Sequence, residues 1–269
     1  MIVAVAGLLR EARIIAGPNV RVIVGGGDTA VLAQRLDEAF ADSSSPVGGG
    51  GPRSGGGGSP SQRRRLDTPS VASRQLPQGG SSLNIHGVVS FGICGALSAA
   101  LKPGDVVVAS SVRDGPARFQ TDSTWTRSIA SRLPTAVSGS IAGSDVMVTT
   151  AEAKVALHGS SGAVAVDMES HVAARFAQRH GLPLAVVRAV SDGADHALPP
   201  AAQLGMRPDG SMDIGAVLRA LAADPRQLLA LIRTGMEAEK GFSALVHSHH
   251  LLGPALGFGE LRHHALDVT

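Results

Sequence analysis

Residues 182–200 read LPLAVVRAVSDGADHALPP, an apolar run that ends in acidic residues and glycine. The run Leu184–Val190 has the length and the β-branched content of a strand, and its lack of polar alternation predicts a strand buried on both faces. Arg188 is the one charged residue inside this run, and we expect it to be a buried partner of an acid. Asp192 and Asp195 follow directly, at the position where α/β sheets carry their ligand-binding groups.

Short apolar runs of this kind recur along the chain and alternate with segments of helical periodicity. We predict strands at 1–6, 20–24, 87–91, 105–109, 137–141, 163–166 and 184–190, and helices at 29–40, 170–180, 214–222 and 226–239. The alternation of strands and helices predicts an α/β fold with a central mixed β-sheet flanked by helices.

One window of different composition interrupts this pattern. Residues 41–82 hold ten of the 34 glycines and carry a net charge of +3. Their few large apolar side chains cannot offset the entropy cost of ordering the chain. We therefore expect a single domain formed by residues 1–40 and 83–269 and interrupted by a disordered Gly/Ser/Pro/Arg-rich insertion. The other 227 residues carry a net charge of −1, which argues against a nucleic-acid partner.

The cysteine count and the hydrophobic pattern bear on location. Cys94 is the single cysteine, so no intrachain disulfide can form, and we expect a reducing, cytoplasmic compartment. We expect Cys94 to be a core thiol rather than a nucleophile. The start, MIVAVAGLLREARII, reads as a buried strand rather than a signal peptide, and no stretch approaches transmembrane length. No metal site is predicted, because the late histidines lack companion ligands; these are His247, His249, His250, His263 and His264.

A glycine-rich turn follows the second predicted strand. Residues 20–36, VRVIVGGGDTAVLAQRL, predict a strand, a turn and a helix, and backbone amides in such a turn suit an anion. Gly25, Gly27 and Ala30 also match G-x-G-x-x-A. The acidic residue that a nicotinamide site needs about 20 residues later would fall in the 41–82 window, which argues against that cofactor. A phosphate site and a structural turn without a ligand both stay open.

Carboxylates follow two of the predicted strands. Asp167 and Glu169 end the stretch AVAVDMES (163–170), as Asp192 and Asp195 end the strand described first. Such residues can be helix caps or turn residues. Two of them can also form a catalytic pair, one carboxyl acting as an acid and the other as an anion.

Several of these stretches together resemble one family, the purine nucleoside and uridine phosphorylases with the methylthioadenosine and adenosylhomocysteine nucleosidases. The stretches are FGICGAL (91–97), PGDVVV (103–108), VDMES (166–170) and VVRAVSDGAD (186–195). A narrower resemblance, to the hopanoid-associated phosphorylases, rests on GLLREARI (7–14), VGGGDTAVLA (24–33), SFGICGAL (90–97) and AQLGMRPDG (202–210). The resemblance implies the single-domain phosphorylase/hydrolase-like fold.

The resemblance also implies roles for individual residues. Asp192 would be protonated, with a pKa raised by burial, and would donate a proton to N7 of the leaving purine. Glu169 would stay ionised and hold the ribose 2′ and 3′ hydroxyls. Met168 would pack on the ribose, and Met147 and Val148 would contact the base. The remaining implied substrate contacts are Ser90, Phe91 and Gly92.

The acceptor of the sugar is either phosphate or water. The resemblance implies inorganic phosphate as co-substrate and no cofactor, with phosphate held by Arg10, Gly7, Gly26 and Gly27. The glutamate that activates water in the nucleosidases falls on Ala12, which favours phosphorolysis, although Glu11 is a candidate base shifted by one residue. Against phosphorolysis, Ile93 stands where the phosphorylases have a phosphate-binding serine.

The function that the resemblance implies is an enzyme, a pentosyl-transferring nucleoside phosphorylase in hopanoid biosynthesis. It would cleave an adenine nucleoside with a bulky hydrophobic 5′ group, adenosylhopane, to adenine and a phosphoribosyl hopane. The alternatives are a hydrolytic nucleosidase and a noncatalytic nucleoside-binding sensor. The expected partners are a small-molecule, lipid-linked nucleoside and further copies of the chain in a homo-oligomer, with peripheral membrane contact and no nucleic acid.

Overall fold

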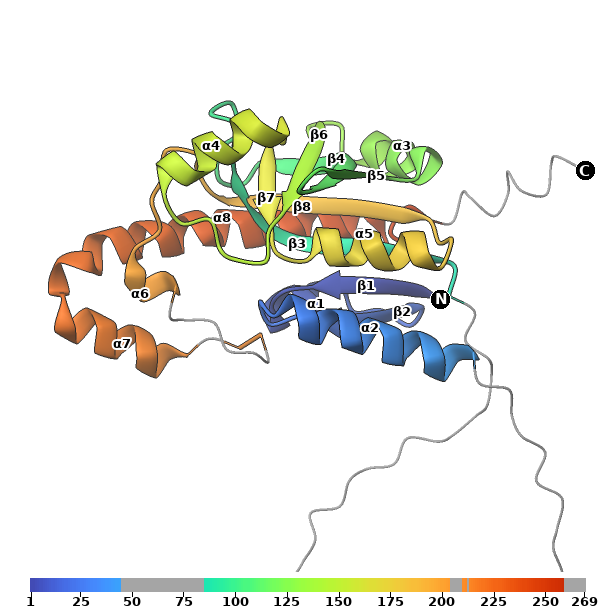
Figure 1. The fold of residues 1–269 in the computed structure, drawn as a ribbon, viewed down its shortest axis with the longest axis horizontal. Coiled ribbons are helices and arrows are strands. Elements are labelled where there is room, and N and C mark those ends of the chain that lie inside the picture. The colour runs from blue at the N-terminus through green and yellow to red at the C-terminus, as the bar shows by residue number, and fades with distance from the viewer. Residues whose placement is uncertain (45–84, 204–209, 212, 259–269) are drawn as a thin grey trace, which may run out of the picture.

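The computed structural model describes residues 1–44, 85–203, 210–211 and 213–258 (Figure 1). The strands are β1 (Ile2–Ala6), β2 (Val20–Val24), β3 (Gly87–Ala96), β4 (Val106–Asp114), β5 (Ala117–Gln120), β6 (Val137–Gly143), β7 (Ala165–Asp167) and β8 (Leu184–Asp192). The helices are α1 (Leu9–Ile15), α2 (Thr29–Ser44), α3 (Ser123–Arg132), α4 (Ala151–Ser161), α5 (Ser170–Arg179), α6 (Pro200–Gln203), α7 (Ile214–Ala223) and α8 (Leu228–Leu252), with a 3₁₀ turn η1 (Pro225–Gln227) before α8.

The strands form one mixed sheet that closes on itself. Its order is β2-β1-β3-β7-β6-β4-β5, and β8 pairs with both β3 and β4. Strands β3, β7, β6, β4 and β8 therefore make a closed ring, from which β1 and β2 extend on one side. Strand β8 runs parallel to β1 and β3 within this arrangement, so their carboxyl ends point to the same edge of the sheet.

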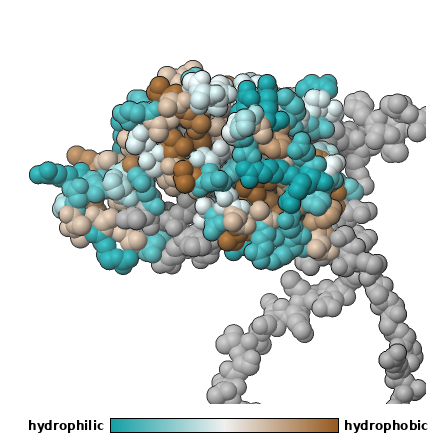
Figure 2. Space-filling model, in the orientation of Figure 1, coloured by the Kyte–Doolittle hydropathy of each residue, from teal (hydrophilic) through white to brown (hydrophobic). Residues whose placement is uncertain are grey.

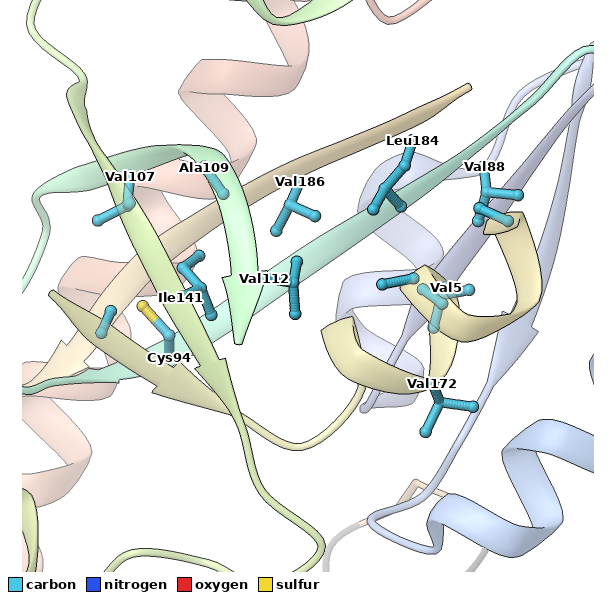
Figure 3. Packing of buried hydrophobic residues seen from close by; sticks show 14 of the residues in the cluster. Val5, Val88, Cys94, Val107, Ala109, Val112, Ile141, Val172, Leu184 and Val186 are labelled. Carbon is cyan, nitrogen blue, oxygen red and sulfur yellow. The ribbon is translucent and has the colours of Figure 1, made fainter. Parts of the chain in front are cut away.

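Helices cover both faces of the sheet (Figure 1). On one face, α2 and α5 pack on a core of aliphatic side chains, among them Val5, Val88, Val112 and Val186, which Figure 3 shows together with Cys94. On the other face, α1, α3 and α8 cover a second core that includes Phe91, Trp125 and Leu245. All nine residues of β8 are buried, because the strand has partners on both sides and helices on both faces.

Helix α7 and the first half of α8 extend beyond the sheet on one side of the molecule (Figure 1). No residue of α7 is buried, and the buried residues of α8 begin at Gly241. This pair of helical segments is called the arm below. Its surface shows hydrophobic and hydrophilic side chains next to one another (Figure 2).

The predicted fold class, an α/β fold with a mixed sheet flanked by helices, is confirmed. Strand 20–24 was predicted with its observed bounds, and helices 170–180 and 214–222 lie within a residue of α5 and α7. The prediction for residues 1–15 was incomplete, because this segment contains α1 as well as β1. The segments α3, α4 and β5 were not predicted. Helix α2 continues to Ser44, beyond the predicted boundary at residue 40, and the rest of the 41–82 window lies outside the described residues.

Candidate functional site

A fully buried arginine organises the first part of the site. The Arg188 side chain points from β8 toward β3 and β7, and its Nε lies 2.5 Å from the Asp167 Oδ2. Nη2 donates to the Ser90 hydroxyl at 2.6 Å, and Nη1 lies 3.2 Å from the Glu169 Oε2. Ser170 donates to the same Asp167 Oδ2 through its hydroxyl and to Oδ1 through its backbone N–H. The expectation that Arg188 pairs with a buried acid is confirmed, and the acids are the two carboxylates of the VDMES stretch.

Glu11 is a third carboxylate at this arginine. It lies in the first turn of α1 and is 1% exposed. Its Oε2 accepts from the N–H groups of Gly7 and Leu8 at 2.7 and 2.8 Å, and its Oε1 accepts from Ile93 N–H at 2.7 Å. Burial raises the pKa of Glu11, while Arg188 and these three amides act in the opposite direction. Glu11, the candidate base shifted by one residue from Ala12, thus lies against Arg188, and its catalytic role stays a prediction.

The surroundings of Glu169 affect its predicted charge. Burial raises the pKa of Glu169 to about 8, against the opposing effect of Arg188; the neighbouring carboxylates of Asp167 and Glu11 raise it further. The raised pKa favours the protonated form of Glu169, and the ionised form expected from the sequence stays a prediction. The cause of the raised pKa is that three carboxyl groups share one guanidinium in a region without solvent.

Two glycines make room for this cluster, called the arginine cluster below and consisting of Glu11, Ser90, Asp167, Glu169, Ser170 and Arg188. A Cβ on Gly92 would lie 2.5 Å from the Glu11 Oε1 and 2.6 Å from the Arg188 Nη1. A Cβ on Gly7 would overlap the Glu169 carboxylate. Gly92 and Gly7 were predicted as ligand-facing positions, but in this structure each lies directly against the charged groups of the cluster.

The second part of the site is centred on Asp192, which ends β8 and is 5% exposed. The Lys154 Nζ lies 2.5 Å from its Oδ2, and the Ser191 hydroxyl lies 2.6 Å from its Oδ1. Lys154 also donates to the carbonyl oxygens of Gly193 and His196, at 2.7 and 2.8 Å. This group is called the lysine–aspartate pair below. Asp192 was predicted as an isolated acid, and its ammonium partner was not predicted.

His196 connects this pair to the arm. Its ring is buried, with Nε2 3.1 Å from the Thr234 Oγ1 and Nδ1 3.3 Å from the Glu237 Oε2, both on α8. The loop that follows Asp192 is thereby held between α4 and α8.

The predicted phosphate residues divide into two groups. Gly7 and Gly26 are adjacent, because Gly26 N–H donates to the Gly7 carbonyl at 3.0 Å, and Gly26 and Gly27 adopt positive φ angles of 64° and 76°. Arg10 instead points to α8, where it makes a two-bond contact with Glu239 at 2.5 and 2.6 Å and lies over the Phe242 ring. The Arg10 guanidinium is thus paired with an exposed carboxylate in this structure, and its phosphate role stays a prediction.

The predicted substrate contacts also need correction at two positions. The Phe91 ring is fully buried in the core between the sheet and α8, so it does not line the site. The Ser90 side chain is fully buried too, and its hydroxyl supports Arg188. Met168, Met147 and Val148 are partly buried, and Val148 packs near Leu97 and Val166; their contacts with a nucleoside stay predictions.

Sequence reasoning missed Lys154 and underrated Glu11, and the sequence contains a signal for each. Glu11 comes four residues after the glycine that ends the first strand, the spacing at which a first-turn carboxylate reaches back to free amides. Lys154 is the only buried residue of α4. The polarity of the other side chains in that helix gives no sign of this burial. A lysine on a helix of mixed polarity is expected to be exposed to solvent unless a partner is known.

Metal sites and membrane-spanning helices were searched for among the described residues. Among these residues, no group of three or more His, Cys, Asp or Glu side chains could hold a metal ion, and His263 and His264 lie outside them. In the same part of the chain, no helix has the length and apolar content needed to cross a bilayer. Cys94 is buried in the core, as expected, and burial raises the pKa of its thiol well above the usual value.

The chain is similar to a known protein family and to several solved structures. Residues 79–223 match the family described as the Phosphorylase superfamily. The fold is similar to the methylthioadenosine/S-adenosylhomocysteine nucleosidase of Helicobacter pylori, with 15% identity over 98% of this chain and 97% of that one and a TM-score of 0.54. It is also similar to a putative methylthioadenosine nucleosidase of Weissella paramesenteroides (16% identity, 92% and 98% coverage, TM-score 0.53) and to the nucleosidase of Colwellia psychrerythraea in complex with adenine (17%, 72% and 84%, 0.51).

Proposed function

The chain belongs to the Phosphorylase superfamily, and from this premise we propose that it cleaves the N-glycosidic bond of an adenine nucleoside. The observation that carries the proposal is the arginine cluster, in which Asp167 and Glu169 pair with Arg188 and the buried Glu11 carboxyl group interacts with the same guanidinium through its charge. As a glycosidic bond breaks, the ribose takes on positive charge. A site with more carboxyl groups than cations stabilises that charge more than it stabilises the neutral nucleoside, which is the requirement for catalysis.

The two parts of the site support complementary roles. Glu169, which the cluster holds at the carboxyl ends of β1 and β2, would bind the ribose hydroxyls and place its carboxyl oxygens against the sugar as positive charge develops there. Asp192, at the end of β8, would deliver a proton to N7 so that adenine leaves as a neutral molecule. The adenine specificity itself rests on the resemblance of the stretch GSDVMV (143–148) to the adenine-contacting segment of the family.

The geometry favours water over phosphate as the acceptor of the sugar. The amides of Gly7, Leu8 and Ile93 already donate to the Glu11 carboxylate, and Arg10 is paired with Glu239. A phosphate dianion would meet three carboxyl groups and few unused donors. Burial raises the pKa of Glu11, which makes its carboxylate a stronger base, and it would accept a proton from the attacking water.

Phosphorolysis, which the sequence favoured, is the second candidate because of the glycine turn. Gly26 and Gly27 have positive φ angles beside Gly7 at the start of α2, a geometry that directs backbone amides toward an anion. Part of this capacity is already used, because Asp28 accepts from the N–H groups of Ala30 and Val31 at 3.0 Å.

The bulky hydrophobic 5′ group of the proposed substrate is supported by the arm. Its exposed apolar side chains include Ile214, Leu218, Leu229, Ile232 and Met236, with exposures between 49% and 79%. Near the site, Gly210, four residues before the arm begins, accepts a hydrogen bond from Leu9 N–H at 3.1 Å. We propose that the arm rests on a lipid surface that presents adenosylhopane or a similar lipid-linked nucleoside.

An anionic lipid surface is the occupant that the charges of the arm favour. Arg219, Arg226, Arg233 and Lys240 recur every seven residues; Arg226 lies in η1, and Arg233 and Lys240 lie on α8 with Leu229, Ile232 and Met236. Apolar side chains bordered by cations are typical of interfacial helices.

Sedimentation with anionic and with zwitterionic vesicles tests this proposal. We expect the protein to bind the anionic vesicles alone, and we expect the double variant Leu229→Glu/Ile232→Glu to lose this binding. Self-association through the arm without vesicle binding would contradict it.

The activity assay compares adenosine, methylthioadenosine and adenosylhopane, each with and without phosphate. We expect adenine release that does not depend on phosphate and is fastest with the hydrophobic 5′ group, with free sugar as the second product. A sugar 1-phosphate that forms only with phosphate would instead establish phosphorolysis. Adenine binding without release from any substrate would leave the noncatalytic sensor, and an Asp192→Asn variant with unchanged turnover would contradict the mechanism.

A further inference from the structure

Lys154 is buried in a way that its helix does not explain. It is fully buried, and it is the only buried residue of α4, whose other side chains are exposed or partly exposed. Removing an ammonium group from water costs several kcal/mol, so such a lysine requires close polar partners. Each of the three N–H bonds of Lys154 has an acceptor: the Asp192 carboxylate, the Gly193 carbonyl and the His196 carbonyl.

This set of partners fits the amine as well as the ammonium. A neutral lysine has two N–H donors and one lone pair. The two carbonyl oxygens can keep both donors, at 2.7 and 2.8 Å, while the lone pair faces the Asp192 oxygen at 2.5 Å. Transfer of the third proton to Asp192 therefore breaks no hydrogen bond. An arginine at this position would lack this property, since its guanidinium stays protonated.

We propose that Lys154 stores the proton that Asp192 delivers to the leaving base, an inference that rests on the proposed function. The proton moves from Lys154 Nζ to the Asp192 carboxylate and from there to N7, while the electron pair of the glycosidic bond passes to the base. The base then leaves neutral, Asp192 is again an anion and Lys154 is an amine, which solvent reprotonates after product release. Lys154 acts through Asp192 and is a positioning residue that does not contact the substrate.

The test uses substrates that differ in their need for a proton. An N7-methylated adenine nucleoside carries a positive charge on the base and releases a neutral base without protonation. Lys154→Met keeps a long unbranched side chain without charge, and Lys154→Arg keeps the charge without a transferable proton. Glu152→Gln, an exposed change on the same helix, is the control.

We expect both Lys154 variants to cleave the ordinary nucleoside about 100-fold or more slowly than wild type, as for loss of a general acid. We expect them to cleave the N7-methylated nucleoside within about threefold of wild type, which also shows that they are folded. Asp192→Asn should show the same selectivity, and adding Lys154→Met to it should cost little more, because the two residues act as a unit.

Two results would overturn the inference while the proposed function stands. Full activity of Lys154→Arg on the ordinary nucleoside would mean that a fixed positive charge is sufficient. An equal loss on both substrates would mean that Lys154 serves the structure of the site rather than proton delivery. If the wild-type protein cleaves neither nucleoside, it is the proposed function that fails, and the inference fails with it.

Discussion

The arginine cluster and the lysine–aspartate pair are both buried, but they balance charge differently. Arg188 faces Glu11, Asp167 and Glu169, so the cluster has more carboxyl groups than cations, and burial raises the pKa of Glu169 to about 8. Lys154 faces Asp192 one to one and completes its hydrogen bonds with two carbonyl groups. The difference shows how one edge of the sheet can support two roles. The arginine cluster suits the positive charge that develops on the ribose, and the lysine–aspartate pair suits the transfer of a proton to the leaving base.

The largest expected effect is on stability, from removal of the cation of the arginine cluster. Arg188→Met leaves three buried carboxyl groups without their counter-charge, and we expect the free energy of unfolding to fall by about 3–5 kcal/mol. Fluorescence of Trp125, the single and fully buried tryptophan, reports unfolding in denaturant. Arg179→Met, which breaks an exposed pair with Asp37, is the control and should cost at most about 1 kcal/mol. Equal losses in the two variants would contradict the assigned role of Arg188.

The next largest effect is on turnover, and it concerns Glu11, whose carboxylate accepts hydrogen bonds from three backbone amides. We expect Glu11→Gln to lower phosphate-independent adenine release by about 10²–10³-fold, because the amide of glutamine is not a base. Steady-state kinetics with and without phosphate measure the change. If phosphate restores turnover in this variant, Glu11 excludes phosphate from the wild-type site. Turnover equal to that of wild type would remove Glu11 from the mechanism.

The pH dependence of stability tests the excess of carboxyl groups. In the folded protein the pKa of Glu169 is about 8 instead of 4.5, so the folded state binds more protons than the unfolded state between these values. The contribution of Glu169 to the free energy of unfolding is therefore greatest below pH 4.5 and falls as the pH rises to 8. We expect Glu169→Gln to remove this decline in denaturant titrations across that range. An unchanged slope in the variant would mean that Glu169 ionises in water-like surroundings.

The smallest expected effect comes from crowding the acid without altering its charge. A Cβ on Gly95 would lie 3.1 Å from the Asp192 Oδ2, so Gly95→Ala should displace the carboxylate slightly and lower kcat several-fold, about 1 kcal/mol in barrier. Gly159→Ala is the matched control, because nothing lies within 4 Å of a Cβ there and α4 continues through it. The control should keep full activity and gain about 0.5–1 kcal/mol in stability. A loss of activity in both variants would contradict a local effect at Asp192.

The fold was largely predictable, because runs of apolar and β-branched residues mark the strands. The site was predictable only in part. The buried strand at 184–190 and the carboxylates after it could be identified from apolar runs and turn residues. Which charges pair could not, because Glu11 and Ile93 are 82 residues apart and Lys154 and Asp192 are 38 apart. Phe91 was misplaced for a related reason: a strand alternates its side chains between two faces, and both faces of β3 are covered here.

The closed ring of strands has a consequence for how the protein folds. Strand β8 completes the ring by pairing with β3 and β4, and it carries both Arg188 and Asp192. Its partners in β3 lie almost a hundred residues earlier, so this pairing involves distant parts of the chain and is expected to form slowly. Until it forms, both charged groups remain hydrated. Their desolvation then coincides with ring closure, so the pairing that closes the ring also brings both charged groups into the site.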